Sequence, residues 1–194
     1  MAGAREKLIN HSLEELRIRG YNAVGVQQIA DAAGMPKGSF YNHFESKEDF
    51  AVAATEAYLA EGVLATTKIL GDKTKTPLRR LIELYAGRTV FEKKRLRGSP
   101  GCLLNTLAQE MAGASPVIRK TVSQAIQTLI DIVADCIGEA AFKSEIHPPL
   151  PVNDLAAFIE TSWRGALLMA RANHSIHALQ NFNKMLPLML GKVD

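Results

Sequence analysis

The sequence predicts an all-α protein of about nine or ten helices. Apolar residues recur at intervals of three and four along most of the chain, as at Ile118, Val122 and Ile126, which places them on one face of a helix. Glycine and proline interrupt the pattern between helices, and no stretch shows the alternation of a strand. We therefore predict an N-terminal helical domain over residues 1–47 and a larger helical bundle over residues 48–194.

The first two helices are delimited by glycine. Apolar residues at helical spacing predict a helix over residues 3–19, and Gly20 follows it where a helix often ends on a left-handed residue. A short second helix is expected over residues 26–33, with Gly25 as its N-cap and Gly34 immediately after it.

The next two helices are marked by proline and serine. A third helix is predicted to begin at Pro36, which suits the first helical turn, and Phe40 and Phe44 have the i, i+4 spacing of core residues. Ser46 with Asp49 three positions later resembles a capping box. We expect it to open a fourth helix that extends to about residue 62 or beyond.

The remaining helices lie between three loops. The stretch 71–77, the motif RGSPGC at 97–102 and the motif HPPLP at 147–151 each stop the periodic pattern. We predict helices between them and after them, over residues 78–96, 100–111, 116–139, 153–172 and 176–190.

Composition excludes several classes of protein. The chain of 194 residues is 47% hydrophobic and 22% charged. This balance is typical of a globular protein. The N-terminus lacks the apolar segment of a signal peptide, and no apolar stretch is long enough to cross a bilayer. Two cysteines exclude a disulfide framework and fit a reducing cytoplasm, which is the expected location.

Net charge alone does not indicate a nucleic-acid partner. The chain carries a net charge of +3, yet residues 1–50 hold six Lys or Arg against seven Asp or Glu. Any DNA-binding function must therefore come from the local arrangement of side chains.

Gly38 stands where a helix is expected to run. Glycine in a helix costs about 1 kcal/mol relative to alanine, so its presence needs a reason. One reason is a tight crossing with another helix. The other is close approach to DNA, because the second and third helices, joined at Gly34, form a helix-turn-helix arrangement whose second helix enters the major groove.

A family resemblance favours the second explanation for Gly38, which is close approach to DNA. Residues 19–50 resemble the DNA-binding domain of the TetR family of transcriptional regulators, and the match includes the pairs Gly20-Tyr21, Ile29-Ala30, Ala33-Gly34 and Lys37-Gly38, with Tyr41, Phe44, Lys47 and Glu48. The family usually has Thr or Ser at the start of the second helix, where this chain has Val24, Gly25 and Val26.

The resemblance implies which residues face DNA. Lys37, Gly38, Ser39 and Tyr41 would face the operator, His43 and Lys47 would contact phosphate, and Gln27 and Gln28 would reach the backbone. Base readout is expected from Lys37 and Ser39. Phe40 and Phe44 are predicted to be core residues, and a plain surface position remains the alternative for His43.

The bundle carries a second resemblance. Residues 98–111 and 163–175 resemble the NemR-type branch of the family, whose members sense electrophiles through a cysteine, and are similar to acrylate-responsive regulators. Cys102 falls on the matching Gly-Cys-Leu. Arg171 stands where that branch can carry a lysine.

The residues around Cys102 also favour a reactive thiol. With Ser99 as N-cap and Pro100 and Gly101 following, Cys102 would lie in the first turn of a helix, where partial positive charge favours the thiolate. Residues 88–97 hold five Lys or Arg against one Glu, and this local positive charge also favours the thiolate. The stretch itself is expected to be a solvated helix end. The alternative for Cys102 is an inert buried residue, as expected for Cys136.

Other candidate residues are weaker. Tyr58, Tyr85 and Asn105 are possible polar groups of an effector pocket, and Trp163 is either core or pocket wall. His174 and His177 lack a third ligand at suitable spacing, so we expect no metal and no cofactor.

Together these features predict a homodimeric repressor. It would bind a pseudo-palindromic double-stranded operator, pair through residues 116–139 and 153–172, and be released by a small molecule or electrophile sensed near Cys102. The alternative effector is a noncovalent lipophilic or carboxylate ligand. An enzyme with a cysteine nucleophile lacks a Cys-His-Asp constellation and is not expected, and a helical interaction module would not explain residues 37–44.

Overall fold

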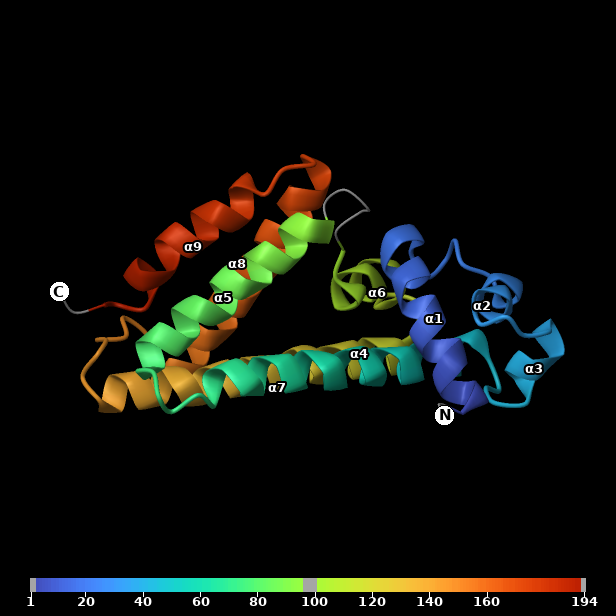
Figure 1. Cartoon of the computed structure of the whole chain (residues 1–194), viewed down its shortest axis with the longest axis horizontal. Coiled ribbons are helices and arrows are strands. Elements are labelled where there is room, and N and C mark those ends of the chain that lie inside the picture. Colours follow the sequence, from blue (N-terminus) through green and yellow to red (C-terminus); the bar gives the residue numbers. More distant parts are fainter. Residues whose placement is uncertain (1–2, 96–100, 193–194) are drawn as a thin grey trace. The chain divides into compact units, whose positions relative to one another are not determined.

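The protein is α-helical, as the sequence predicts. The computed structural model describes residues 3–95 and 101–192. Within them the chain forms nine helices and no named strand (Figure 1): α1 (Ala4–Arg19), α2 (Val26–Ala32), α3 (Lys37–Tyr41), α4 (Lys47–Leu70), α5 (Pro77–Arg95), α6 (Leu103–Met111), α7 (Pro116–Phe142), α8 (Val152–Ala172) and α9 (His177–Met189).

The helices form two compact units. The first unit comprises the residues up to Glu61 together with Gly101–Ile126, and the second comprises the other described residues. Helices α4 and α7 contribute to both, whereas α6 belongs to the first unit although the whole of α5 precedes it in sequence. The predicted domain boundary after residue 47 separates a DNA-binding function from a ligand-binding function, whereas the two units are defined by how compactly they pack. The predicted boundary therefore stays a prediction.

Aromatic packing holds the first unit together. The rings of Phe40, Phe44 and Phe50 lie 5.1–5.6 Å apart between centroids and are all buried, in agreement with the predicted core role of Phe40 and Phe44. Such pairs contribute about 0.5–1.5 kcal/mol each beyond the area they bury. They fix the short helix α3 against the start of α4.

Two predicted helix starts and one predicted capping box need correction. Pro36 is the N-cap of α3 rather than its first residue, and α3 ends at Tyr41, so Phe44 lies beyond it. The Ser46 hydroxyl accepts the Asp49 N–H at 3.0 Å as predicted, but the Asp49 carboxylate accepts from Glu45 N–H, so the capping box is incomplete. Helix α6 begins at Leu103 and not at residue 100.

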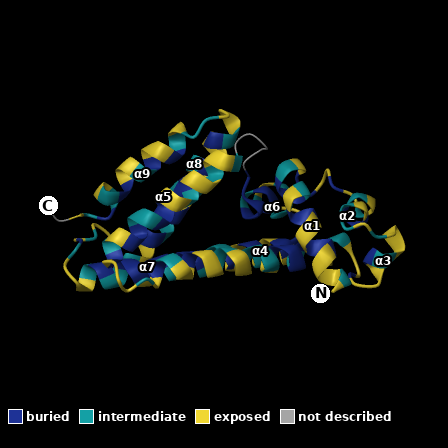
Figure 2. Cartoon of the chain, viewed as in Figure 1, coloured by how far each residue is buried: buried dark blue, intermediate teal, exposed yellow. Residues whose placement is uncertain are grey.

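In the second unit, α9 packs against both α5 and α8. Buried apolar residues of these helices face one another, and the outer faces are exposed (Figure 2). Leu84, Ile159 and Leu186 are among the residues removed from solvent. Each such side chain stabilises the fold by about 1.5–3 kcal/mol. The second unit is therefore a helical bundle with its own core.

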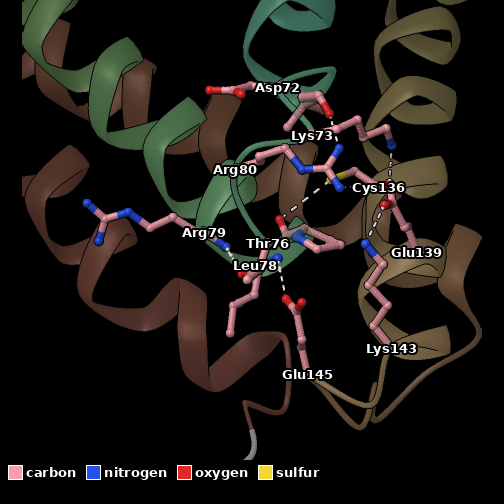
Figure 3. A network of polar contacts seen from close by, with 12 residues as sticks. Asp72, Lys73, Thr76, Leu78, Arg79, Arg80, Cys136, Glu139, Lys143 and Glu145 are labelled. Atoms are coloured by element: carbon pink, nitrogen blue, oxygen red, sulfur yellow. Dashed lines mark hydrogen bonds and ion pairs between the residues drawn. The ribbon is translucent and has the colours of Figure 1, made fainter.

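A polar network around Glu139 ties α7 to α5 and to the segment between α4 and α5 (Figure 3). Its carboxylate receives Lys73 Nζ at 2.6 Å, Arg80 Nη2 at 2.8 Å and Lys143 Nζ at 3.0 Å. Hydrogen bonds from these cations lower the pKa of Glu139 from 4.5 to about 2. Arg80 is buried and also donates to the Leu70 carbonyl at the end of α4.

Candidate nucleic-acid interface and sensor residues

Helix α3 presents an exposed face that carries three of the predicted DNA contacts. Lys37, Gly38 and Tyr41 are exposed, with 55% of the Tyr41 surface accessible, whereas Phe40 is fully buried. The Tyr41 ring packs edge-on against Phe40 at 5.3 Å, which holds it in place. The helix therefore offers an exposed cation, Lys37, and a phenol held in place, Tyr41, to an outside partner.

Gly38 has no neighbour that would require glycine. A Cβ added there would meet nothing within 4 Å. The alternative of a tight crossing within the chain is therefore wrong, and the backbone at Gly38 is bare toward solvent. This geometry suits close approach of a second molecule such as DNA.

The flanking candidates are partly occupied by contacts within the unit. Gln27 Nε2 donates to Asp31 Oδ1 at 2.7 Å. Gln28 Oε1 accepts the Gly25 N–H at 2.7 Å at the N-terminus of α2, and Gly25, the N-cap residue, provides no side-chain hydrogen bond of the kind that a Thr or Ser would make there. His43 is exposed.

Ser39 lies at the edge of the exposed face of α3. It is half-buried, and its hydroxyl donates to Met35 Sδ at 3.9 Å. A contact with sulfur is a weak hydrogen bond, so the hydroxyl can exchange it for a stronger acceptor on a bound partner.

Lys47 at the start of α4 is held by the turn between α1 and α2. Its Nζ donates to the Tyr21 carbonyl at 2.5 Å and lies 4.1 Å from the centroid of the Tyr21 ring. Burial lowers the pKa of Lys47, and the nearby Glu110 carboxylate partly offsets this. Because an ammonium has three donors, Lys47 can still donate to a phosphate.

The predicted sensor residues fall into two groups, one in each unit. Tyr58, Cys102 and Asn105 belong to the first unit, where Asn105 is half-buried on α6. Tyr85, Trp163 and Arg171 belong to the second, where Arg171 is half-buried in the last turn of α8.

Cys102 lies at the N-cap of α6 and not in its first turn. Its backbone is extended, with φ −97° and ψ 122°, and its carbonyl accepts the Thr106 N–H at 3.0 Å as the first helical bond. Ser99 and Pro100, which the sequence analysis assigned to that helix start, lie outside the described residues. The Cys102 side chain is 9% exposed, and the Tyr58 hydroxyl donates to its Sγ at 3.8 Å.

Tyr85 and Trp163 meet in the core of the second unit. Their ring centroids lie 5.6 Å apart, and both pack on Phe182, at 5.0 Å and 5.3 Å. Trp163 is therefore a core residue, and Tyr85 is fully buried. Burial and the neighbouring Glu160 carboxylate raise the pKa of Tyr85 well above 10, so its hydroxyl stays a donor.

A buried ion-pair cluster beside these rings was missed by sequence reasoning. Glu160 on α8 is 1% exposed and accepts hydrogen bonds from Tyr85 Oη at 2.8 Å and Arg88 Nη1 at 2.7 Å. Arg164, one turn further along α8, lies 3.5 Å from its other oxygen. The sequence signal was a Glu and an Arg four residues apart on α8, a helix with buried apolar residues.

The basic stretch before Cys102 is solvated only in part. Lys93 and Lys94 are exposed, as predicted for a solvated helix end. Arg88 departs from that prediction, because it is 20% exposed, binds Glu160 and also donates to Thr66 Oγ1 at 3.2 Å. Arg95 stacks over the Phe91 ring at 4.6 Å. Arg97 lies outside the described residues.

Cys136 is a core residue, as predicted. It is buried, and its Sγ donates to the Pro77 carbonyl at 3.6 Å. Burial raises the pKa of the Cys136 thiol to about 11, so the reactive thiolate is scarce at neutral pH.

Metal and membrane sites were searched within the described residues. No group of three or more His, Cys, Asp or Glu side chains there is arranged to hold a metal ion. Over the same ranges, no helix combines the length and the apolar character needed to span a membrane. His177 opens α9, and its ring Nδ1 lies 3.3 Å from the Asn181 amide nitrogen.

A short exposed helix that follows another helix across a turn is the arrangement of a helix-turn-helix DNA-binding domain. Residues 8–54 match the family described as bacterial regulatory proteins, tetR family, and residues 77–186 match the tetracyclin repressor-like C-terminal domain. The chain belongs to the TetR family of DNA-binding transcriptional regulators.

Named relatives share nearly the whole chain. The repressor DhaR of Mycobacterium sp. is 32% identical over 92% of this chain and 87% of its own. The regulator AcuR of Cereibacter sphaeroides is 32% identical over 93% and 82%. The repressor NemR of Escherichia coli is 26% identical over 91% and 88%. The resemblance to the NemR- and AcuR-like branch is thereby confirmed.

The fold is shared with a solved regulator as well. The crystal structure of the regulatory protein TetR from Rhodobacter sphaeroides superimposes with a TM-score of 0.86 at 32% identity, covering 96% of this chain and 98% of that one. These relatives are transcriptional regulators, and none of their names denotes an enzyme.

Proposed function

We propose that the protein is a homodimeric repressor that leaves its operator when a small electrophile reacts at Cys102. The observation that carries the proposal is the place of Cys102 at the start of α6, in contact with Tyr58 of α4 and inside the same compact unit as the DNA-reading helices. A change at this sulfur therefore occurs in the same unit as α2 and α3, the helices predicted to bind DNA. The regulator would act in the cytoplasm.

The chemistry is addition of the thiol to an unsaturated carbonyl compound. The Cys102 sulfur forms a bond to the β-carbon, the carbon–carbon π bond breaks, and the thiol proton ends on the α-carbon. No oxidant is needed. Thiolate is the attacking form, and the Tyr58 hydroxyl at 3.8 Å is placed to donate a hydrogen bond to it.

Dimerisation is proposed through α8 and α9. Exposed apolar side chains gather on these helices, including Leu188, which is 70% exposed, with Phe158, Leu168, Met169 and Met185. A pseudo-palindromic operator calls for a two-fold symmetric protein. The sequence analysis named residues 116–139 beside α8. On α7 the exposed large apolar residues, Val117 and Phe142, stand at its ends, so α9 is the better partner for α8.

A noncovalent carboxylate effector is the second candidate. Tyr85 and Arg88 donate to the Glu160 carboxylate beside the Trp163 and Phe182 rings, and a ligand carboxylate would take the place of Glu160 on these two donors. Arginine and tyrosine donors recognise carboxylates, and aromatic walls suit an apolar tail. Under this reading Cys102 has no chemical role.

One set of gel shifts separates the candidates. DNA from the protein's own promoter region is bound by wild type and titrated with acrolein or with acrylate. We expect acrolein to release wild type, Cys136→Ser to respond alike, and Cys102→Ser to bind DNA normally but to stay bound. Full release of Cys102→Ser, with no adduct on Cys102 by mass spectrometry, would exclude covalent sensing and favour the carboxylate candidate.

A further inference from the structure

Polar contacts just before α6 and at its end join this segment to α1 and to the turn between α1 and α2. Its apolar residues Leu103, Leu104 and Leu107 are fully buried, which holds the helix in the first unit but does not fix its position along its own axis. Hydrogen bonds are directional, so they fix the position of the helix along its axis.

The contact at the start of α6 comes from Arg17 of α1. Its Nε donates to the Gly101 carbonyl at 2.8 Å, and its Nη1 pairs with Glu14 at 2.7 Å. The Arg17 side chain is only 3% exposed. A buried guanidinium is costly unless it is paired and hydrogen-bonded, so this contact is a specific link between α1 and the residue before Cys102.

The contact at the end of α6 comes from Glu110. Its Oε2 accepts the Asn22 N–H at 2.8 Å, in the turn between α1 and α2. Its carboxylate also occupies the space where a Cβ of residue 20 would stand, and Gly20 has φ +89°, a conformation that favours glycine. The turn is therefore shaped around Glu110.

The turn between α1 and α2 also contacts Lys47, one of the residues predicted to bind DNA. Tyr21 accepts the hydrogen bond from Lys47, and α2 packs on α3. Just after α6, the Ser115 hydroxyl donates to Glu48 in the first turn of α4. The segment 101–115 thus contacts α1, the α1–α2 turn and the start of α4.

We propose that Arg17 and Glu110 are positioning residues for DNA reading, and that α6 transmits displacement of Gly101 and Cys102 to the α1–α2 turn through them. Helix α6 has only nine residues. A helix this short moves as a rigid body because each of its turns is tied to the next by backbone hydrogen bonds, so a shift at one contact reaches the other. The source of the displacement rests on the proposed function, whereas the coupling between the two contacts does not.

The decisive variant is Arg17→Met, which breaks the contact at Gly101 and leaves Glu110 untouched. Hydrogen exchange of the Asn22 amide reports on the distant contact at Glu110. Arg19→Met is the matched control, because Arg19 is exposed, pairs with Glu15 at 3.5 Å on the same helix, and lies closer to Asn22 in sequence. Glu110→Ala and Glu110→Gln, with exposed Gln109→Ala as control, test the second contact.

We expect Arg17→Met to speed Asn22 exchange at least about fivefold and to raise the acrolein concentration for half-release from operator by a similar factor. Arg19→Met and Gln109→Ala should behave as wild type. Glu110→Ala should repeat the change in release, and Glu110→Gln should rescue part of it, since its amide oxygen can still accept the Asn22 N–H.

Unchanged Asn22 exchange in Arg17→Met would overturn the coupling and leave the contacts as static packing. If acrolein releases every variant equally, the coupling fails while the proposed function stands. If acrolein does not release wild type and Asn22 exchange still responds to Arg17→Met, electrophile sensing fails while the positioning role stands.

Discussion

Glu160 is a buried charge whose removal has a calculable cost. Glu160→Leu would leave Arg88 and Arg164 facing an apolar side chain and would remove the acceptor of the 2.8 Å bond from Tyr85 and the 2.7 Å bond from Arg88. Breaking a buried ion pair by removing one partner costs about 3–5 kcal/mol. With a urea dependence of about 2 kcal/mol per M, the unfolding midpoint should fall by about 1.5–2.5 M.

The assay is urea unfolding followed by far-ultraviolet circular dichroism. Asp154→Asn is the matched control on the same helix, where Asp154 is an exposed carboxylate in the first turn. Such a carboxylate contributes only about 0.3–1 kcal/mol. The double variant Arg88→Met/Glu160→Leu should cost less than the sum of the single variants, because apolar replacement of both partners is often nearly neutral. A Glu160→Leu midpoint equal to wild type, or strict additivity, would refute the reasoning.

Three further predictions concern the reader and the Glu139 network. Lys37→Ala and Tyr41→Ala should each weaken operator binding by about 1–3 kcal/mol with the fold intact, and fluorescence anisotropy at two salt concentrations measures this. Gly38→Ala should raise stability by up to about 1 kcal/mol, because its methyl group meets open space, while operator affinity falls; unchanged affinity would count against close approach of DNA. The pKa of Glu139 is lowered from 4.5 to about 2. The ionised Glu139 carboxylate therefore stabilises the folded state fully above pH 4.5, and this contribution is lost as the pH falls toward about 2. Glu139→Gln should therefore unfold with a flatter pH profile in that window, and a profile parallel to wild type would contradict it.

Local signals in the sequence account for most of the helix boundaries. Gly20 and Gly25 could be placed at helix ends because each interrupts a local apolar pattern, and Phe40 and Phe44 are core residues because their spacing already places them on one face. Such features depend on neighbours in sequence, which pattern analysis can read.

The polar links of the sites depend on residues far apart in sequence. Arg88 and Glu160 are separated by 72 positions, and Arg17 and Gly101 by 84, so no local period relates them. The start of α6 was misplaced for a different reason. Pro and Gly before Cys102 are compatible with a first helical turn, but the structure keeps Gly101 outside the helix, where its carbonyl receives Arg17.

The discontinuous first unit has a consequence for building chimeric regulators. Exchanging residues 1–47 alone between relatives would bring a foreign α1 and α1–α2 turn against this chain's residues 101–115, and Gly101 and Glu110 would lose Arg17 and the Asn22 amide as partners unless the incoming segment matches both contacts. We expect grafts that move residues 101–115 together with the reader to keep inducible repression. Grafts cut only after residue 47 should bind the donor's operator yet respond poorly to the recipient's signal.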